Sequence, residues 1–378
     1  MRPLEILERY AALGLHRTGN PTDGATAAWL EDLLSGAGAR VERHGYGFPM
    51  VKGAASLAAP LADVPLLPLY YAGEGTLETE RVHLVSLPFE VDHVPEGIGG
   101  LLASAVAEAQ AAGAEVAVLT TPCPNDSLCA INRDPRNRIG FPICLAPGRA
   151  LERLHSNPLH IRYSVEIGPG ESENLTAVWR APGDKRLPIM ITTPTTGWFT
   201  CAGERGSGLA VALSVAQAMA DRHPILLSLM SGHELGFMGG RRFAEAFDEP
   251  LAGVLHLGSC VADKAGYEAA AGRFMPDALT AVTNLAPDGF AAIRQILEPL
   301  GVPLRRPERP RDPACWIGES QLWAERGVPM LSIAGASPTF HTPEDTFEAA
   351  ADPGLLQSVC DRALRCLDVL AETAGQAQ

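Results

Sequence analysis

Apolar and polar positions follow two different periods along the chain. Near the N-terminus, apolar residues at helical spacing predict helices over residues 4–13 and 23–37, and an alternating stretch predicts a strand over 40–48. Between about Ala54 and Gly170 the pattern changes to short strands, 82–87, 115–120 and 161–167, around one helix, 98–112. This pattern therefore predicts a small α/β insert in the middle of the chain.

From Glu171 onward, apolar strands alternate with helices. The strands are expected over 174–179, 188–193, 225–230, 253–257 and 329–334, and the helices over 208–220, 240–246, 290–300 and 352–374. Strands that are apolar at nearly every position are typical of a mostly parallel sheet covered by helices on both faces. We therefore predict an α/β chain with two units: residues 1–53 with 171–378, and an insert, 54–170.

Composition supports two units in one soluble chain. The 378 residues are 46% hydrophobic and 20% charged, and they exceed the roughly 250–300 residues at which a single core stops growing. The 30 basic and 44 acidic residues give a net charge of −14 without a basic run, which argues against nucleic acid or an anionic membrane as a partner.

Targeting signals are not evident in the sequence. Charges interrupt the N-terminal segment, and apolar runs stay short of the roughly 20 residues of a membrane span. Eight scattered cysteines without Cys-x-x-Cys pairs favour a reducing cytoplasm.

Chemically active side chains follow four of the predicted strands. In an open α/β sheet, ligands bind beyond the carboxyl ends of the strands, so these side chains should converge at one edge. The candidates are three histidines, two glutamates and an arginine: His233, His256, His341, Glu204, Glu234 and Arg205.

Two kinds of chemistry fit these residues. Glu204, Glu234 and His341 would bind one zinc-like ion from different loops and leave a position open for water. Alternatively, His233 would be a general base beside Glu234, while Arg205 holds a substrate carboxylate or a developing oxyanion. The Gly-x-Ser-x-Gly motif of serine hydrolases does not occur, whereas spacing alone does not exclude Cys201 or Cys260 as a thiol nucleophile.

At these residues the sequence resembles the co-catalytic zinc aminopeptidases of metallopeptidase family twenty-eight, which also contains relatives of glutaminyl cyclase. The resemblance covers most of the chain. It includes the segment from His16 to Asp23, the stretches 113–120 and 141–145, which are similar to a protease-associated domain, and the return strand at Glu173. It implies a zinc aminopeptidase-like sheet with a protease-associated-like insert.

The resemblance also implies an altered metal site. The first histidine ligand of the family falls in Thr193–Thr196, where there is no histidine, and a ligand aspartate aligns with Gly258. The bridging aspartate aligns with Glu204, and the Glu-Glu pair aligns with His233-Glu234, so that His233 replaces the glutamate base. The losses affect one metal, whereas Glu204, Glu234 and His341 match the ligands of the other. The chain is therefore expected to bind at most one divalent metal, with zinc preferred, or none, in which case Glu204 and Glu234 pair with Arg205 and His256.

Each candidate also has a purely structural explanation. Glu234 fits the first turn of a helix, Glu204 and Arg205 fit an ion pair, and His256 fits a buried core histidine. Trp198, Cys201 and Ser207 are candidate substrate-binding residues, with a core aromatic ring, a buried thiol and a helix N-cap as the alternatives.

We therefore expect a cytoplasmic hydrolase acting on the amide bond of a peptide or small molecule. The catalytic residues would be His233, Glu234, Arg205 and His256. The alternative is a non-catalytic descendant that binds a ligand or partner in the same cleft. A homo-oligomer is compatible with such a fold, although the sequence gives no interface.

Overall fold

The computed structural model describes residues 2–87, 95–121, 123–274 and 278–376. Most described strands belong to one large sheet, in the order β1-β7-β9-β8-β10-β13-β11-β12, with β3 paired to β7. These strands are β1 Arg40–Leu57, β3 Gly75–Thr79, β7 Ile161–Trp179, β8 Ile189–Pro194, β9 Ile225–Met230, β10 Gly253–Leu257, β11 Leu279–Thr283, β12 Leu304–Arg305 and β13 Met330–Gly335.

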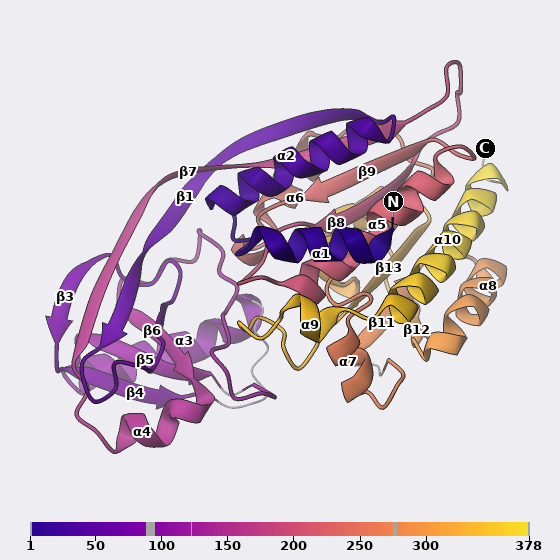
Figure 1. Cartoon of the computed structure of the whole chain (residues 1–378). Coiled ribbons are helices and arrows are strands. Elements are labelled where there is room, and N and C mark those ends of the chain that lie inside the picture. The colour runs from indigo at the N-terminus through magenta and orange to yellow at the C-terminus, as the bar shows by residue number, and fades with distance from the viewer. Residues whose placement is uncertain (1, 88–94, 122, 275–277, 377–378) are drawn as a thin grey trace.

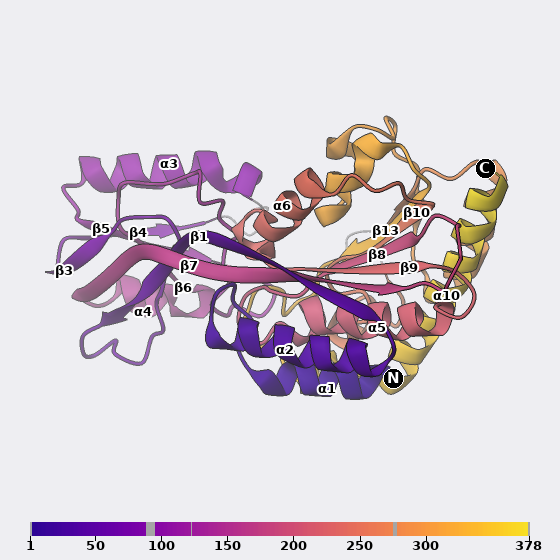
Figure 2. The ribbon, with the colours of Figure 1, turned by 90° about the horizontal axis from the view of Figure 1, so that it is seen from above.

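The four central strands, β9, β8, β10 and β13, are parallel, and antiparallel strands flank them. Helices cover both faces: Figure 2 shows α1, α2, α5 and α10 on one side of the sheet and α6 on the other. The predicted α/β class with a largely parallel, doubly covered sheet is confirmed. The helices are α1 Pro3–Leu13, α2 Pro21–Gly36, α5 Ser207–Met219, α6 Met238–Ala246, α7 Lys264–Ala269, α8 Pro287–Leu297, α9 Phe347–Ala350 and α10 Pro353–Gln376.

The sequence explains the centre of this architecture. Every residue of β8, β9 and β10 is buried, as expected for apolar strands with helices on both sides. Helix α5 is buried along almost its whole length, because its small residues, mainly alanine, allow it to lie between the sheet and the neighbouring helices α1 and α10.

A second, smaller sheet lies at one end of the molecule (Figure 1). Its order is β2-β6-β5-β4, from β2 Leu67–Pro68, β4 Val82–Ser86, β5 Val116–Thr121 and β6 Ile143–Pro147, and β4, β5 and β6 are parallel. Helices α3 Pro95–Ala111 and α4 Leu151–His155 lie on its two sides (Figure 2).

Two long strands join the sheets. The predicted strands 161–167 and 174–179 are parts of one strand, β7, and the strand expected over 40–48 continues as β1 to Leu57. They pair antiparallel from Arg40–Val178 to Leu57–Ile161. Glycines and prolines interrupt the apolar alternation between the predicted segments. The two strands nevertheless pair along their whole length, with Pro49 opposite Pro169. The expected boundaries 53/54 and 170/171 therefore fall inside continuous strands.

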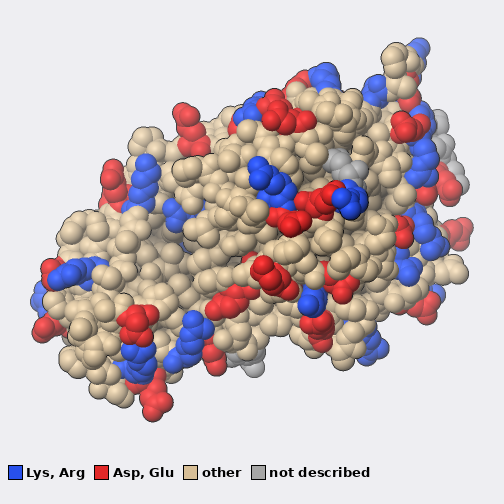
Figure 3. Space-filling model, viewed as in Figure 1, with Lys and Arg blue, Asp and Glu red and all other residues tan. Residues whose placement is uncertain are grey.

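The distribution of charged side chains on the surface agrees with the composition of the chain. Acidic and basic side chains are interspersed on the face seen in Figure 3. Among the described residues, no helix combines the length and apolarity needed to cross a membrane.

Candidate functional site

The carboxyl ends of β8, β9, β10 and β13 meet at one edge of the large sheet, because these neighbouring strands run parallel. Each of the six predicted residues lies at this edge and is buried, with exposed fractions of the whole residue between 0 and 8%. The convergence expected from the sequence is therefore present, although the pairing of the side chains differs from the expected one.

Glu204 and Arg205 lie in a π-helical turn, Ala202–Gly206, between β8 and α5. The Asp345 carboxylate, from the loop after β13, holds this turn by accepting hydrogen bonds from the backbone N–H groups of Gly203 (2.6 Å) and Glu204 (2.9 Å). Both side chains are fully buried, and the Arg205 guanidinium donates a hydrogen bond to Glu204. Single π-helical turns inside α-helices are frequent at functional sites.

His341 completes one half of the cluster. Its Nε2 lies 3.2 Å from Glu204 Oε1, at an angle outside hydrogen-bond geometry, and its Nδ1 lies 3.1 Å from the carbonyl oxygen of Ala130. Burial alone would raise the pKa of Glu204, but the positive charge of Arg205 and the neighbouring imidazole outweigh it and lower that pKa to about 2. Glu204 is therefore a carboxylate at neutral pH.

Glu319 organises the other half. Its Oε1 lies 2.5 Å from Nδ1 of His233, and its Oε2 lies 3.7 Å from Nε2 of His256. The Nδ1 of His256 lies 2.8 Å from the Ser332 hydroxyl. Burial would raise the pKa of Glu319, but the interactions with the His233 and His256 imidazoles and the charge of Arg205 hold it well below its usual range. The pKa of His233 is lowered by burial and by Arg205, against the opposing effect of Glu319.

The Glu234 carboxylate forms its hydrogen bonds outside both halves of the cluster. Its Oε1 accepts a hydrogen bond from the backbone N–H of Thr18 (2.7 Å), and its Oε2 accepts one from the Thr196 hydroxyl (3.0 Å). Burial raises the pKa of Glu234 to about 7, in spite of these hydrogen bonds. Of the two metal-free pairings expected, Glu204–Arg205 is present, whereas Glu234 contacts threonines and His256 lies beside Glu319.

The three predicted substrate-binding residues are buried. Trp198 donates its indole N–H to Asn132 (2.8 Å). Cys201 is fully buried against the Tyr10 hydroxyl (3.2 Å), and burial raises the pKa of its thiol well above the usual value. Ser207 is the first residue of α5, whose N-cap is Gly206, and its hydroxyl donates to the Gly203 carbonyl (2.6 Å) four residues earlier.

Several polar atoms of the cluster lack a hydrogen-bond partner. They are Glu204 Oε2, Arg205 Nε and Nη1, His256 Nε2, Glu319 Oε2 and His341 Nε2. Unpaired buried polar atoms are uncommon in proteins and mark a place for a ligand, water or ion. Within the described residues, however, no group of three or more His, Cys, Asp or Glu side chains is arranged to hold a metal ion.

Some residues of the cluster come from outside the strand ends and are not among the predicted site residues. Glu319 lies in the 3₁₀ segment Gly318–Arg326. This segment follows no predicted strand, and its sequence is typical of an ordinary polar helix. A loop from the smaller-sheet region also reaches the cluster: Ala130 N–H donates to the carbonyl of His341 (2.9 Å), and Arg133 N–H donates to that of Glu234 (2.9 Å). No local pattern signals these contacts.

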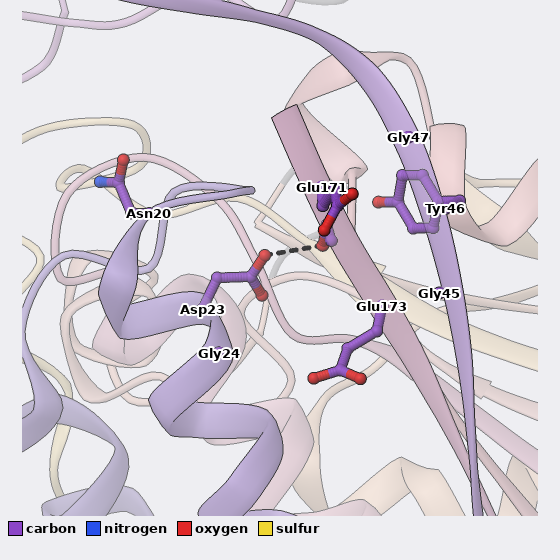
Figure 4. Close-up of a pocket in the computed structure, with 9 residues that line it drawn as sticks. Asn20, Asp23, Gly24, Gly45, Tyr46, Gly47, Glu171 and Glu173 are labelled. Atoms are coloured by element: carbon purple, nitrogen blue, oxygen red, sulfur yellow. Dashed lines mark hydrogen bonds between the residues drawn. The ribbon is translucent and has the colours of Figure 1, made fainter. Parts of the chain in front are cut away.

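A separate acidic pocket of about 540 Å³ lies between α2, β1 and β7 (Figure 4). The carboxylate of Asp23 accepts a hydrogen bond from Ser172 (2.6 Å), and burial raises the pKa of Asp23 to about 6. Glu171 and Glu173 also line the pocket. The hydroxyl oxygens of Ser172 and Ser231 lie 3.0 Å apart. Because Ser231 lies two residues before His233, the pocket adjoins the loop that carries the candidate base.

Comparison with known proteins gives matches in structure only. No protein-family model matches the sequence, and no curated protein matches it. Among solved structures, a zinc aminopeptidase of Bacillus subtilis superposes with a TM-score of 0.73 at 15% identity, covering 97% of this chain and 93% of that chain.

Two further structures extend this likeness. A peptidase precursor of Shewanella amazonensis, of metallopeptidase family twenty-eight, has a TM-score of 0.75 at 18% identity, with 98% of this chain and 93% of that chain covered. The glutaminyl cyclase of Porphyromonas gingivalis has a TM-score of 0.51 at 12% identity, with 97% and 96% covered. At these identities the likeness shows the fold, which is that of the zinc aminopeptidases.

Proposed function

We propose that this chain hydrolyses an amide-type bond in a peptide or small molecule, with His233 as the general base and Glu319 as its positioning residue. The observation that carries the proposal is the 2.5 Å contact between His233 Nδ1 and Glu319 Oε1. A carboxylate at Nδ1 fixes the tautomer in which Nε2 is free to accept a proton. The His233 side chain is also 10% exposed, against 0–3% for Glu204, Arg205, His256, Glu319 and His341.

The electrostatics suit a base. Because burial and Arg205 lower the pKa of His233, its imidazole is neutral at pH 7. In the proposed reaction, Nε2 takes a proton from water, the resulting hydroxide attacks the carbonyl carbon, and the same proton passes to the departing amine nitrogen. Glu319 remains ionised and stabilises the transient imidazolium.

Arg205 is assigned to the developing negative charge. Its guanidinium is fully buried, and its Nε and Nη1 have no hydrogen-bond partner. A fixed cation with free N–H groups in a dry site stabilises an oxyanion more than it would in water. Glu234 is a positioning residue in this scheme, because both of its oxygens hold the loops at Thr18 and Thr196.

Zinc, which the fold relatives suggest, does not fit the predicted ligand set. Glu234 uses both oxygens for Thr18 and Thr196, and Glu204 uses Oε1 for Arg205. Glu204 Oε2 and His341 Nε2 are the uncommitted donor atoms that remain, fewer than the three protein ligands of a catalytic zinc site. The proposed steps therefore use residues of the chain alone. We also place the protein in the cytoplasm, because its eight cysteines are all free.

The test is turnover of a panel of aminoacyl anilides, dipeptides and N-acyl amino acids, with and without added Zn²⁺, Co²⁺ and Mn²⁺. For any substrate turned over by the wild type, His233→Ala and Glu319→Gln should each lower kcat by about 10²–10⁴-fold with an unchanged melting profile. His223→Ala is the matched control, because His223 precedes β9 and lies at the opposite end of that strand from the site. Wild-type kcat in His233→Ala would overturn the assignment of the base.

A second candidate is a binding protein without catalysis. It is favoured by the internal pairing of the side chains, because Glu204 is paired with Arg205 and Glu319 contacts His233 without a substrate. If no amide in the panel is turned over under any metal condition, while a panel member raises the melting temperature, the binding function replaces the hydrolase.

A further inference from the structure

The buried cluster contains the chemical groups of a metal site. Glu204 Oε2, Glu319 Oε2, His256 Nε2 and His341 Nε2 are all buried and without a hydrogen-bond partner. Carboxylate oxygens and imidazole nitrogens are zinc ligands in proteins. Yet the described residues do not form a group of three that could hold an ion.

Arg205 interacts electrostatically with both halves of this cluster. Its guanidinium donates a hydrogen bond to Glu204, and Glu204 and Glu319 both attract its charge. Its remaining nitrogens, Nε and Nη1, are buried and unpartnered like the carboxylate and imidazole atoms around them. One permanent cation of the chain thus attracts both buried carboxylates of the cluster.

We propose that Arg205 is the built-in cation of this centre, in the place of a divalent metal, and that the protein works without a metal for this reason. A guanidinium stays ionised at every physiological pH, so the charge it provides is permanent. It also repels a divalent ion from the buried carboxylates, since charges interact strongly in a medium of low dielectric constant.

The role of Arg205 as the cation of the cluster can be tested without a substrate. Removal of the Arg205 side chain leaves two buried carboxylates unbalanced beside imidazoles, which is an unfavourable state unless a cation enters. Arg205→Ala should therefore bind a divalent metal that the wild type excludes. The inference does not depend on hydrolysis, so its failure and that of the proposed function are distinguishable.

The experiment compares zinc content in protein purified from zinc-supplemented cultures and dialysed without chelator. We expect wild-type protein with almost no zinc and Arg205→Ala with about one zinc ion per chain. Zn²⁺ should raise the melting temperature of Arg205→Ala by several degrees, and EDTA should reverse this, with no change in wild type. Arg133→Ala, which removes another buried arginine with an unpartnered Nε, is the matched control and should gain no zinc.

A triple variant, Arg205→Ala with Glu204→Gln and His341→Ala, should lose the gained zinc and so locate it in the cluster. Zinc in wild type at about one ion per chain that is lost on Glu204→Gln and His341→Ala would overturn the proposal. A folded, zinc-free Arg205→Ala would also overturn it. If Arg205→Ala does not fold, refolding decides: rescue by Zn²⁺ supports the proposal, and failure with Zn²⁺ contradicts it.

Discussion

Glu234 shows how a residue type in the expected place can have a different role. The pattern His233-Glu234 after an apolar strand suggests a metal ligand, and the structure does place Glu234 at the sheet edge. The sequence does not identify the hydrogen-bond partners of Glu234, because Thr18 is 216 residues away and Thr196 is 38 residues away. Glu319 is missed for the same reason, since it reaches His233 across 86 residues of chain.

At the residue scale, we predict that Glu234→Gln stabilises the protein at high pH. The pKa of Glu234 is raised from 4.5 to about 7, so the folded state retains a proton that the unfolded chain loses between these values. The free energy of unfolding of wild type therefore falls across this window and stays lowered above pH 7. Glutamine is neutral and preserves an acceptor for Thr18, so the variant should be more stable by about 2–3 kcal/mol at pH 8.

The measurement is urea unfolding at pH 4 and pH 8, with Glu8→Gln on the exposed face of α1 as the control. The advantage of Glu234→Gln should disappear at pH 4, where both folded states are neutral at this position. An equal change at both pH values would show that packing, and not the buried charge, determines the difference.

At the element scale, the regular parts of the fold were accessible from the sequence. The buried strands β8, β9, β10 and β13 lie close to their predicted ranges because each is a largely apolar run. Helices α5 and α10 do so because each has a long stretch of helical periodicity. Strand β11, Leu279–Thr283, is not among the predicted strands, since its sequence Leu-Thr-Ala-Val-Thr lacks a continuous apolar run. The π-helical turn Ala202–Gly206 was also not predicted, because it depends on Asp345 from a distant loop.

That turn leads to a prediction about Gly203. A Cβ atom at this position would lie 2.5 Å from Asp263 Oδ1 and 2.9 Å from Asp345 Oδ1. Asp345 cannot move away without releasing the N–H groups of Gly203 and Glu204. Gly203→Ala should therefore destabilise the protein by about 1–3 kcal/mol and displace Glu204 and Arg205, which lowers any turnover.

The matched control is Gly24→Ala in α2, where a Cβ atom meets nothing within 4 Å. An alanine in an open helical position should stabilise by about 0.5–1 kcal/mol. Thermal and urea unfolding of both variants checks the pair. If Gly203→Ala unfolds like Gly24→Ala, the contact of Asp345 with the π-helical turn is not what fixes Glu204 and Arg205.

At the scale of the whole molecule, the smaller sheet and the large sheet share both a ladder and the site. The β1–β7 ladder runs from one sheet region to the other, and the loop containing Ala130, Asn132 and Arg133 contacts the segments of His341, Trp198 and Glu234. We propose that residues 54–170 are an insert, similar to a protease-associated domain, in a catalytic unit of residues 1–53 and 171–378. Its role in this proposal is to cover the cluster and exclude bulk water from it.

Deletion of the insert tests this division. Leu57 and Ile161 are facing partners at the end of the β1–β7 ladder, so an Asn-Gly turn can replace residues 58–160 and close a hairpin. We expect the shortened chain to keep the helical circular dichroism of the large unit, because the cores of α5, α10 and β8–β10 do not include the deleted residues. Its melting temperature should fall, since Tyr163 and Val165 lose their cover. Turnover should vanish with the loss of the loop over His341 and Glu234. An unfolded shortened chain would show that the two units form one cooperative unit. A shortened chain that retains turnover would show that the cluster does not need the insert.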